Sequence, residues 1–166
     1  FSAVVTGVPG SNVLVFSENF DGVTVPGLPT GWTTSASGGQ SVWVTQNAVR
    51  DTVPNAAFSP DPASVAINEL VSPPIAVSAG KMQLTFRHSY SLESGSGNEG
   101  YDGGVLEIKI GSGAFTDIIA SGGAFVSGGY AHTIHGGYGN PLAGREAWSG
   151  NSGGFVTTTV DLPAAV

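Results

Sequence analysis

The sequence predicts an all-β fold, an antiparallel β-sandwich of the jelly-roll type. Glycine and proline, with 26 and 10 residues, divide the 166-residue chain into short segments. Those segments are rich in valine, threonine and other residues that favour strands. Only 10% of the residues are charged, and the scarcity of strong helix formers excludes an α-rich fold. The length suits one domain, and a closed β-barrel is the alternative architecture.

The first half of the chain contains four segments with strand composition. Ala3–Thr6 and Val13–Phe16 are apolar and β-branched, and a Pro-Gly pair separates them. In Ser41–Gln46, valines alternate with a tryptophan and a threonine, which is the period of a half-buried strand. Its tryptophan, Trp43, is expected in the core. Glu69–Ser72 is a fourth strand, which two prolines end.

The second half begins with the clearest strand, Lys81–Tyr90. Up to His88, its even-numbered side chains are apolar or aromatic and its odd-numbered ones are polar. Val105–Ile110 and Phe115–Ile119 flank a Gly-Ser-Gly segment, which predicts a hairpin. A long glycine-rich segment follows, and Phe155–Val160 is the last expected strand. These short strands with intervening turns favour the sandwich.

Charge and cysteine content exclude several classes of function. Five basic and twelve acidic residues give a net charge of −7, whereas nucleic-acid binding depends largely on lysine and arginine. The chain has no cysteine, so disulfides and thiolate metal sites are excluded. No apolar run is long enough for a transmembrane helix. We therefore expect no nucleic-acid partner and no membrane insertion, and the low charge suits a secreted protein.

Several segments together resemble a known type of domain. They are Glu18–Gly22 with Leu28–Trp32, Phe86–Glu93 with Tyr101–Ile108, and Asn140–Gly150. Over about residues 16–166 the chain is similar to the jelly-roll accessory domain found beside secreted bacterial peptidases and in large surface proteins. That domain is related to the MAM-like modules of immune inhibitor A. The most specific motif is a glutamate before Tyr-Asp-Gly-Gly and an alternating strand.

The resemblance implies a secreted, non-catalytic module of a larger protein, with ligands that are mostly unassigned. It also implies further strands after Phe155–Val160 and the Asp-Leu-Pro turn that follows. Because the sequence ends at Val166, we expect the jelly roll to lack its last strand or strands.

The histidines do not form a pattern typical of nucleophilic catalysis, so we predict no enzyme and no catalytic residue. Ser127 lacks the strand-turn-helix context of a nucleophile elbow. His88 is in phase with apolar side chains and is interpreted as a buried histidine bonded to a neighbour such as Glu93. His132 and His135 are interpreted as exposed loop histidines. A metal site on that loop, completed by a carboxylate, is the alternative.

Acidic residues in two loops favour calcium. Calcium accepts carboxylate, amide and carbonyl oxygens and tolerates irregular loops. Glu93, Glu99 and Asp102 lie close together in a loop rich in glycine, serine and asparagine, and Glu18 and Asp21 precede a glycine turn. We predict Ca²⁺ at one of these loops. In the alternative interpretation, Asp102 caps a turn and Glu93 pairs with a basic neighbour in the preceding strand.

The glycine-rich segment 121–144 also carries a candidate ligand-binding site. Aromatic residues in strands usually belong to the core, but Tyr130 and Tyr138 lie in a glycine-rich loop, where we expect exposure. With His132 and Asn140 they form a possible glycan-binding site.

The N-terminal residues 1–15 are expected to form a strand or arm, and residues 16–166 the sandwich. Phe1–Val8 is apolar and lies outside the resemblance. We expect it to fill the groove left by the missing strand, either in its own chain or in the next copy. Exchange between copies would be β-strand addition and would build a filament. An ordinary edge strand or linker is the alternative.

Together these features predict a secreted or cell-surface module with a structural, adhesive or assembly role. Its expected partners are other protein modules or copies of itself. The alternative is a carbohydrate-binding module that accompanies a secreted hydrolase, with a glycan as its partner.

Overall fold

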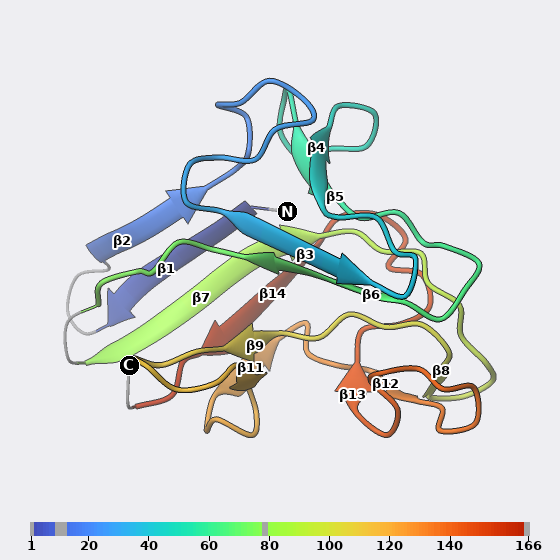
Figure 1. Ribbon diagram of the computed structural model, residues 1–166. Coiled ribbons are helices and arrows are strands. Elements are labelled where there is room, and N and C mark those ends of the chain that lie inside the picture. Colours follow the sequence, from blue (N-terminus) through green and yellow to red (C-terminus); the bar gives the residue numbers. More distant parts are fainter. Residues whose placement is uncertain (1, 9–12, 78–79, 165–166) are drawn as a thin grey trace.

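The protein is all-β, as its sequence predicts. Figure 1 shows the computed structural model, which describes residues 2–8, 13–77 and 80–164. Over these residues the chain forms fourteen strands and no helix. No helix with the length and apolar character needed to cross a membrane is therefore found in the described part. Frequent glycine and proline and few helix formers account for this architecture.

The largest layer is an antiparallel sheet of five strands in the order β11-β14-β7-β1-β2 (Figure 1). The strands are β11 (Ala124–Ser127), β14 (Val156–Asp161), β7 (Lys81–His88), β1 (Ser2–Val8) and β2 (Val13–Glu18). The central strand is β7, which pairs with β14 and with β1. Segments distant in sequence are thus joined by the sheet.

The alternation in β7 decides which face of this sheet is buried. Met82 and Phe86 are buried on one face, and Thr158 of β14 lies opposite Phe86 and is also buried. Hydrogen-bonding polar pairs cross the other face: Gln83 with Asp161, Thr85 with Thr159, and Arg87 with Thr157. This division is typical of an antiparallel sheet with one solvated face.

The remaining strands form four small sheets. β3 (Thr33–Ser37) pairs with β6 (Ile67–Val71), β4 (Val44–Gln46) with β5 (Ala56–Phe58), and β9 (Glu107–Ile108) with β10 (Thr116–Asp117). The fourth sheet has the order β13 (Glu146–Ala147), β12 (His132–Ile134) and β8 (Glu99–Gly100). The β9–β10 pair is the hairpin that the Gly-Ser-Gly segment predicts.

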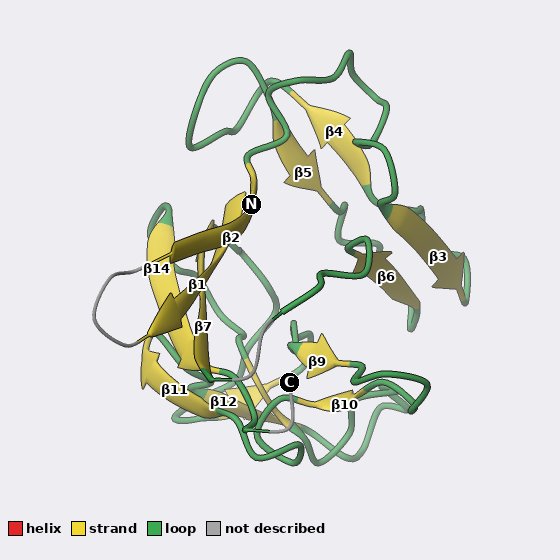
Figure 2. Cartoon of the chain, turned by 90° about the vertical axis from the view of Figure 1, so that its left-hand side faces the viewer, coloured by secondary structure: helices red, strands yellow, loops and turns green. Residues whose placement is uncertain are grey.

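Figure 2 shows how these sheets are arranged in space. The β3–β6 pair stands opposite the five-stranded sheet, and β9 and β10 lie across the lower end. This arrangement is consistent with a sandwich. The jelly-roll topology stays a prediction.

The core lies on the inner face of β7, around Trp148. Trp148 and Phe86 are buried, and their rings meet edge to face at 5.6 Å. The half-buried side chains that pack against them are Leu84, Tyr90, Leu106, Phe125 and Tyr130. Trp43 lies just before β4, is half-buried and is outside this cluster. Its prediction as a core residue is therefore wrong.

Strand β1 lies inside the sheet of its own chain, between β2 and β7. Of the two arrangements expected for Phe1–Val8, the single chain thus shows insertion of Ser2–Val8 into its own sheet; Phe1 lies outside the described residues. Exchange of this strand between copies stays a prediction.

Candidate functional site

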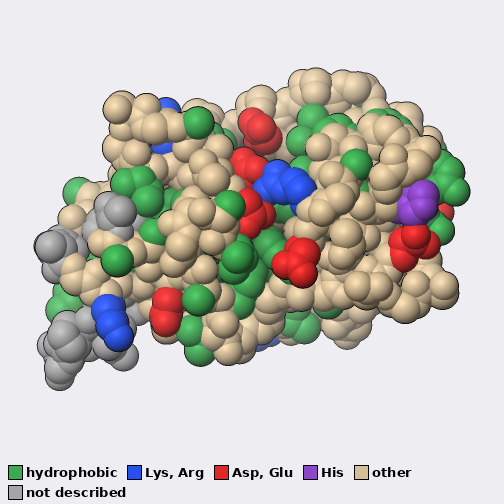
Figure 3. Space-filling view, turned by 90° about the horizontal axis from the view of Figure 1, so that it is seen from below, with side chains coloured by type: hydrophobic (Ala, Val, Ile, Leu, Met, Phe, Trp, Pro, Cys, Tyr) green, Lys and Arg blue, Asp and Glu red, His purple; other side chains and the backbone are tan. Residues whose placement is uncertain are grey.

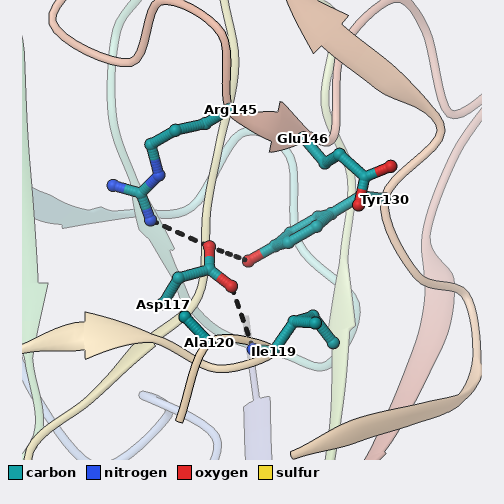
Figure 4. A pocket seen from close by; sticks show the side chains of 6 residues that line it. All are labelled: Asp117, Ile119, Ala120, Tyr130, Arg145 and Glu146. Atoms are coloured by element: carbon teal, nitrogen blue, oxygen red, sulfur yellow. Dashed lines mark hydrogen bonds and ion pairs between the residues drawn. The ribbon is translucent and has the colours of Figure 1, made fainter. Parts of the chain in front are cut away.

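One hollow on the surface is lined by side chains from three segments. It has a volume of about 310 Å³. Its lining residues, drawn in Figure 4, are Asp117, Ile119, Ala120, Tyr130, Arg145 and Glu146. Asp117 belongs to β10 and Glu146 to β13, so the hollow lies where two small sheets adjoin the core.

Arg145 is held in this hollow by two carboxylates. Its Nη1 lies 2.7 Å from Oε1 of Glu107, and its Nη2 lies 2.9 Å from Oδ2 of Asp117. Burial lowers the pKa of Arg145, but the hydrogen bonds to these carboxylates outweigh it, and the net shift is upward. A charge-assisted pair on each side of one guanidinium fixes its position.

Tyr130 closes the same network from the core side. Its hydroxyl accepts a hydrogen bond from the Leu106 N–H at 2.8 Å and lies 3.3 Å from Oδ2 of Asp117. Burial raises the pKa of Tyr130 well above its usual range. The charged groups in this hollow already pair with one another. We therefore interpret the hollow as a structural contact between the segments that line it.

A second cluster of aromatic and titratable side chains lies at the surface near β8 and β12. It consists of Glu99, Tyr101, His135 and Tyr138, which we call the Tyr138 cluster. The His135 ring lies 5.0 Å from the Tyr138 ring, and Tyr101 meets Tyr138 edge to face at 5.5 Å. The parallel pairing of β8 with β12 brings these two chain segments together.

Glu99 is the polar centre of the Tyr138 cluster. Its Oε2 accepts a hydrogen bond from the Tyr101 hydroxyl at 3.2 Å, and its Oε1 lies 3.4 Å from Nε2 of His135. The hydrogen bond to Glu99 raises the pKa of Tyr101. The Gly137 N–H donates to Nδ1 of His135 at 2.9 Å. Because Nδ1 accepts that bond, the neutral ring carries its proton on Nε2, toward Glu99.

The predicted ligand-binding residues divide between these places. Tyr138 is exposed, as expected, with 67% of its surface accessible. Tyr130 is not: its ring packs 4.8 Å from Trp148 and also from Phe125, so its predicted exposure is wrong. A tyrosine in a glycine-rich segment can still enter the core when its hydroxyl finds partners there.

Asn140 and His132, the other two predicted ligand-binding residues, take different roles. Asn140 donates to the Tyr101 carbonyl at 2.8 Å and accepts from the Leu142 N–H at 2.8 Å. It therefore holds the loop after β12 against the Tyr138 cluster. His132 is half-buried in strand β12, so its prediction as an exposed loop histidine is wrong; its Nδ1 is buried with no hydrogen-bond partner among the described residues.

The acidic residues of the first predicted calcium loop accept hydrogen bonds from that loop and from the distant segment that contains Thr52 and Asn55. Glu18 accepts from the Phe20 N–H at 2.6 Å. Asp21 accepts from the side chains of Asn19 and Thr52 and from the Asn55 N–H. These bonds shape the turn after β2. Across residues 13–77 and 80–164, no three histidine or acidic side chains gather in a way that could hold a metal ion.

The other predicted calcium loop is organised mainly by its backbone. The Glu93 carbonyl accepts from the N–H groups of Tyr101 and Asp102 at 2.9 and 3.0 Å. Burial, with the negative charges of Asp61 and Glu93, raises the pKa of Asp102. Glu99 belongs to the Tyr138 cluster. Calcium binding at these residues stays a prediction.

His88 is half-buried among aromatic rings, on the face of β7 that its alternation phase predicts. Its ring lies 4.8 Å from that of Trp148 and 5.0 Å from that of Phe86. Its Nε2 lies 2.9 Å from the Thr158 hydroxyl, which itself donates to the Gly128 carbonyl. The expected bond to Glu93 is therefore wrong. Burial lowers the pKa of His88 to about 4.

We expect His88 to make the protein more stable as the pH rises. Between its folded pKa of about 4 and the ordinary value of 6.5, the unfolded chain binds a proton that the folded chain excludes. The unfolding free energy therefore rises through this window, by at most about 3 kcal/mol, and levels off above it. Urea unfolding of the wild type and of His88→Phe, followed from pH 4 to 7, measures this contribution.

The variant should show the smaller slope, and His135→Gln is the control because it changes a histidine outside the core. Equal slopes for the wild type and His88→Phe would contradict the assignment.

Comparison of the chain with protein-family models, with curated proteins and with solved structures gave no match. The similarity to the jelly-roll accessory domains therefore stays a resemblance.

Proposed function

We propose that the protein is a non-catalytic extracellular module with an assembly role, which pairs with a second copy of itself along strand β2. One observation carries this proposal. β2 lies at the end of the five-stranded sheet, yet Val13, Leu14 and Val15 are exposed by 62%, 57% and 37%. Proteins usually protect an edge strand with lysine, proline or a covering loop. An apolar edge is therefore a surface suited to pairing.

The direction of the strands favours a second copy in a twofold arrangement. Successive strands of the sheet are antiparallel, so the two edge strands, β2 and β11, run in the same direction. A head-to-tail contact between them that keeps the same face of the sheet inward would be parallel. Two β2 strands related by a twofold axis are antiparallel, like the rest of the sheet, and form a closed dimer.

The charge distribution supports the same partner. The chain carries a net charge of −7, which opposes association through most of its surface. Val13–Ser17 has no charged residue. Two copies can therefore meet along this segment without placing like charges opposite each other.

The hydrogen bonding around His88 supports a role other than catalysis. Its hydroxyl partner, Thr158, is fully buried and donates its proton to a backbone carbonyl. A nucleophile must instead be accessible and give its proton to the base. The extracellular location rests on the low charge and on the resemblance to secreted modules.

Sedimentation velocity over a range of protein concentrations tests the assembly. The wild type should change from monomer to dimer, and Leu14→Lys should raise the dimer dissociation constant about tenfold or more, because twofold symmetry places two new charges close together. Val65→Lys is the matched control, since Val65 is 54% exposed and lies in a loop.

The control should dimerise like the wild type, and both variants should melt at the wild-type temperature. A wild type that stays monomeric at every concentration, or a Leu14→Lys variant that dimerises normally, would refute the proposal.

A further inference from the structure

The Tyr138 cluster presents an open aromatic surface. Tyr138 is 67% exposed and lies in the glycine-rich turn after β12. No atom lies within 4 Å of the position that a Cβ would take on Gly136 or Gly139. Space is therefore open around both glycines, on either side of the exposed ring. Figure 3 shows histidine, acidic and hydrophobic side chains near one another at one end of the molecule.

Two neighbouring rings also hold the Tyr138 ring in place. His135 packs against it at 5.0 Å with the two planes tilted by 35°, and Tyr101 supports it edge to face. Asn140 fixes this loop by its bond to the Tyr101 carbonyl. A supported ring loses little conformational freedom when a ligand stacks on it, which favours binding.

Glu99 adds hydrogen-bonding capacity to the two residues that contact the exposed ring, Tyr101 and His135. The Glu99 carboxylate receives the Tyr101 hydroxyl and faces His135. An ionised carboxylate offers about four acceptor positions, so sites for further donors remain on Glu99. The Tyr138 hydroxyl is a second polar group at the ring's edge.

We propose that Tyr138, His135 and Glu99 form a binding site for one neutral pyranose ring of a glycan. The apolar C–H face of the sugar would stack on Tyr138, and two of its hydroxyls would donate to Glu99. Apolar contact with a few well-placed polar groups is the usual composition of a small-ligand site.

The ring geometry disfavours other aromatic ligand sites. The ring planes of Tyr101 and Tyr138 lie at 85° to each other, and their ring centroids are 5.5 Å apart. This contact leaves no slot between the two rings for a cation or a proline ring. A cation cage and a polyproline groove both need separated rings. Glu99 and the net charge of −7 disfavour acidic sugars. A single exposed ring can stack on one face of a sugar, and the carboxylate of the same cluster can accept hydrogen bonds from its hydroxyls.

This site is separate from the assembly edge. Tyr138 follows β12 in the three-stranded sheet, whereas β2 is the edge of the five-stranded sheet. Sugar binding and dimer formation can therefore fail independently, and each experiment tests its own proposal.

The test uses the full chain on an array of neutral and acidic glycans, followed by NMR titration with methyl glycosides of neutral hexoses at millimolar concentration. Tyr138→Ala should weaken binding about tenfold or more, Glu99→Gln should weaken it less, and Tyr138→Phe should retain stacking. Phe115→Ala is the matched control, because Phe115 is an aromatic residue on another loop and is 48% exposed.

Neutral glycans that bind, with loss of binding in Tyr138→Ala and normal binding in Phe115→Ala, would support the proposal. Absence of binding to every neutral glycan would overturn it. The proposal would also be overturned if the protein bound only acidic glycans, or only a proline-rich peptide included as a separate arm. The same holds if Tyr138→Ala bound neutral glycans as tightly as the wild type. Unchanged melting temperatures of the variants show that the fold is intact, since Tyr138 lies outside the core.

Discussion

Replacement of Trp148 by alanine is expected to lower the free energy of unfolding by about 3–5 kcal/mol, the usual cost of removing a large buried aromatic side chain. Trp148 is only 5% exposed and joins the inner face of β7 to β11 and to Tyr130. Its ring contacts those of Phe86, His88, Phe125 and Tyr130. The cavity left by alanine would remove the Trp148 side of each contact. This loss is large because the total unfolding free energy of a small domain is only about 5–15 kcal/mol.

Trp148→Phe keeps this prediction testable if the alanine variant does not fold. Phenylalanine retains most of the packing but loses the 2.8 Å bond from the indole N–H to the Gly128 carbonyl. It should cost clearly less, about 1–2 kcal/mol. Urea unfolding measures both variants, with Phe58→Ala, at a 42% exposed position, as the control. A cost of Trp148→Ala no larger than that of the control would contradict the central role of Trp148.

Gly128→Ala is expected to destabilise the fold by about 2–5 kcal/mol, for two reasons that add. The first is the backbone: Gly128 has a φ of 66°, which disfavours every residue with a side chain. The second is space: an added Cβ would lie 2.4 Å from the Thr157 carbonyl oxygen and 2.9 Å from the Thr158 hydroxyl. The neighbouring backbone of β14 would have to move.

Gly153→Ala separates the two contributions. Gly153 has a φ of 70°, but no atom lies within 4 Å of its Cβ position. It should show the conformational cost alone, about 1–2 kcal/mol. Thermal and urea unfolding of the two variants would give the difference. Equal costs would show that close packing at Gly128 does not contribute.

Much of the fold follows from local patterns. The alternation in Lys81–Tyr90 predicts β7 and its buried face, because a strand places successive side chains on opposite sides. The Gly-Ser-Gly segment predicts the hairpin of β9 and β10, although these strands are shorter than expected, with two residues each. Val13–Phe16 is part of β2, and Phe155–Val160 coincides with β14 except at its ends.

The candidate sites follow from the sequence only in part. The exposure of Tyr138 is predicted by its glycine-rich surroundings, yet Tyr130 in the same segment is packed against Trp148. Glu99 and Tyr101 are two residues apart, a spacing that places side chains on one face of a strand. Their meeting with His135 depends on the β8–β12 pairing, which no local signal reveals.

By itself, the sequence determined the all-β class, the positions of the main strands, the inward face of β7 and the placement of His88 on that face. These depend on residue type and on a period of two, which nearby residues are enough to express. Only the tertiary structure decided that β1 lies between β2 and β7, that Arg145 joins Glu107 and Asp117, and that Tyr130 enters the core. Such contacts join segments far apart in the chain, and they are selected by how all the strands pack together rather than by any one of them.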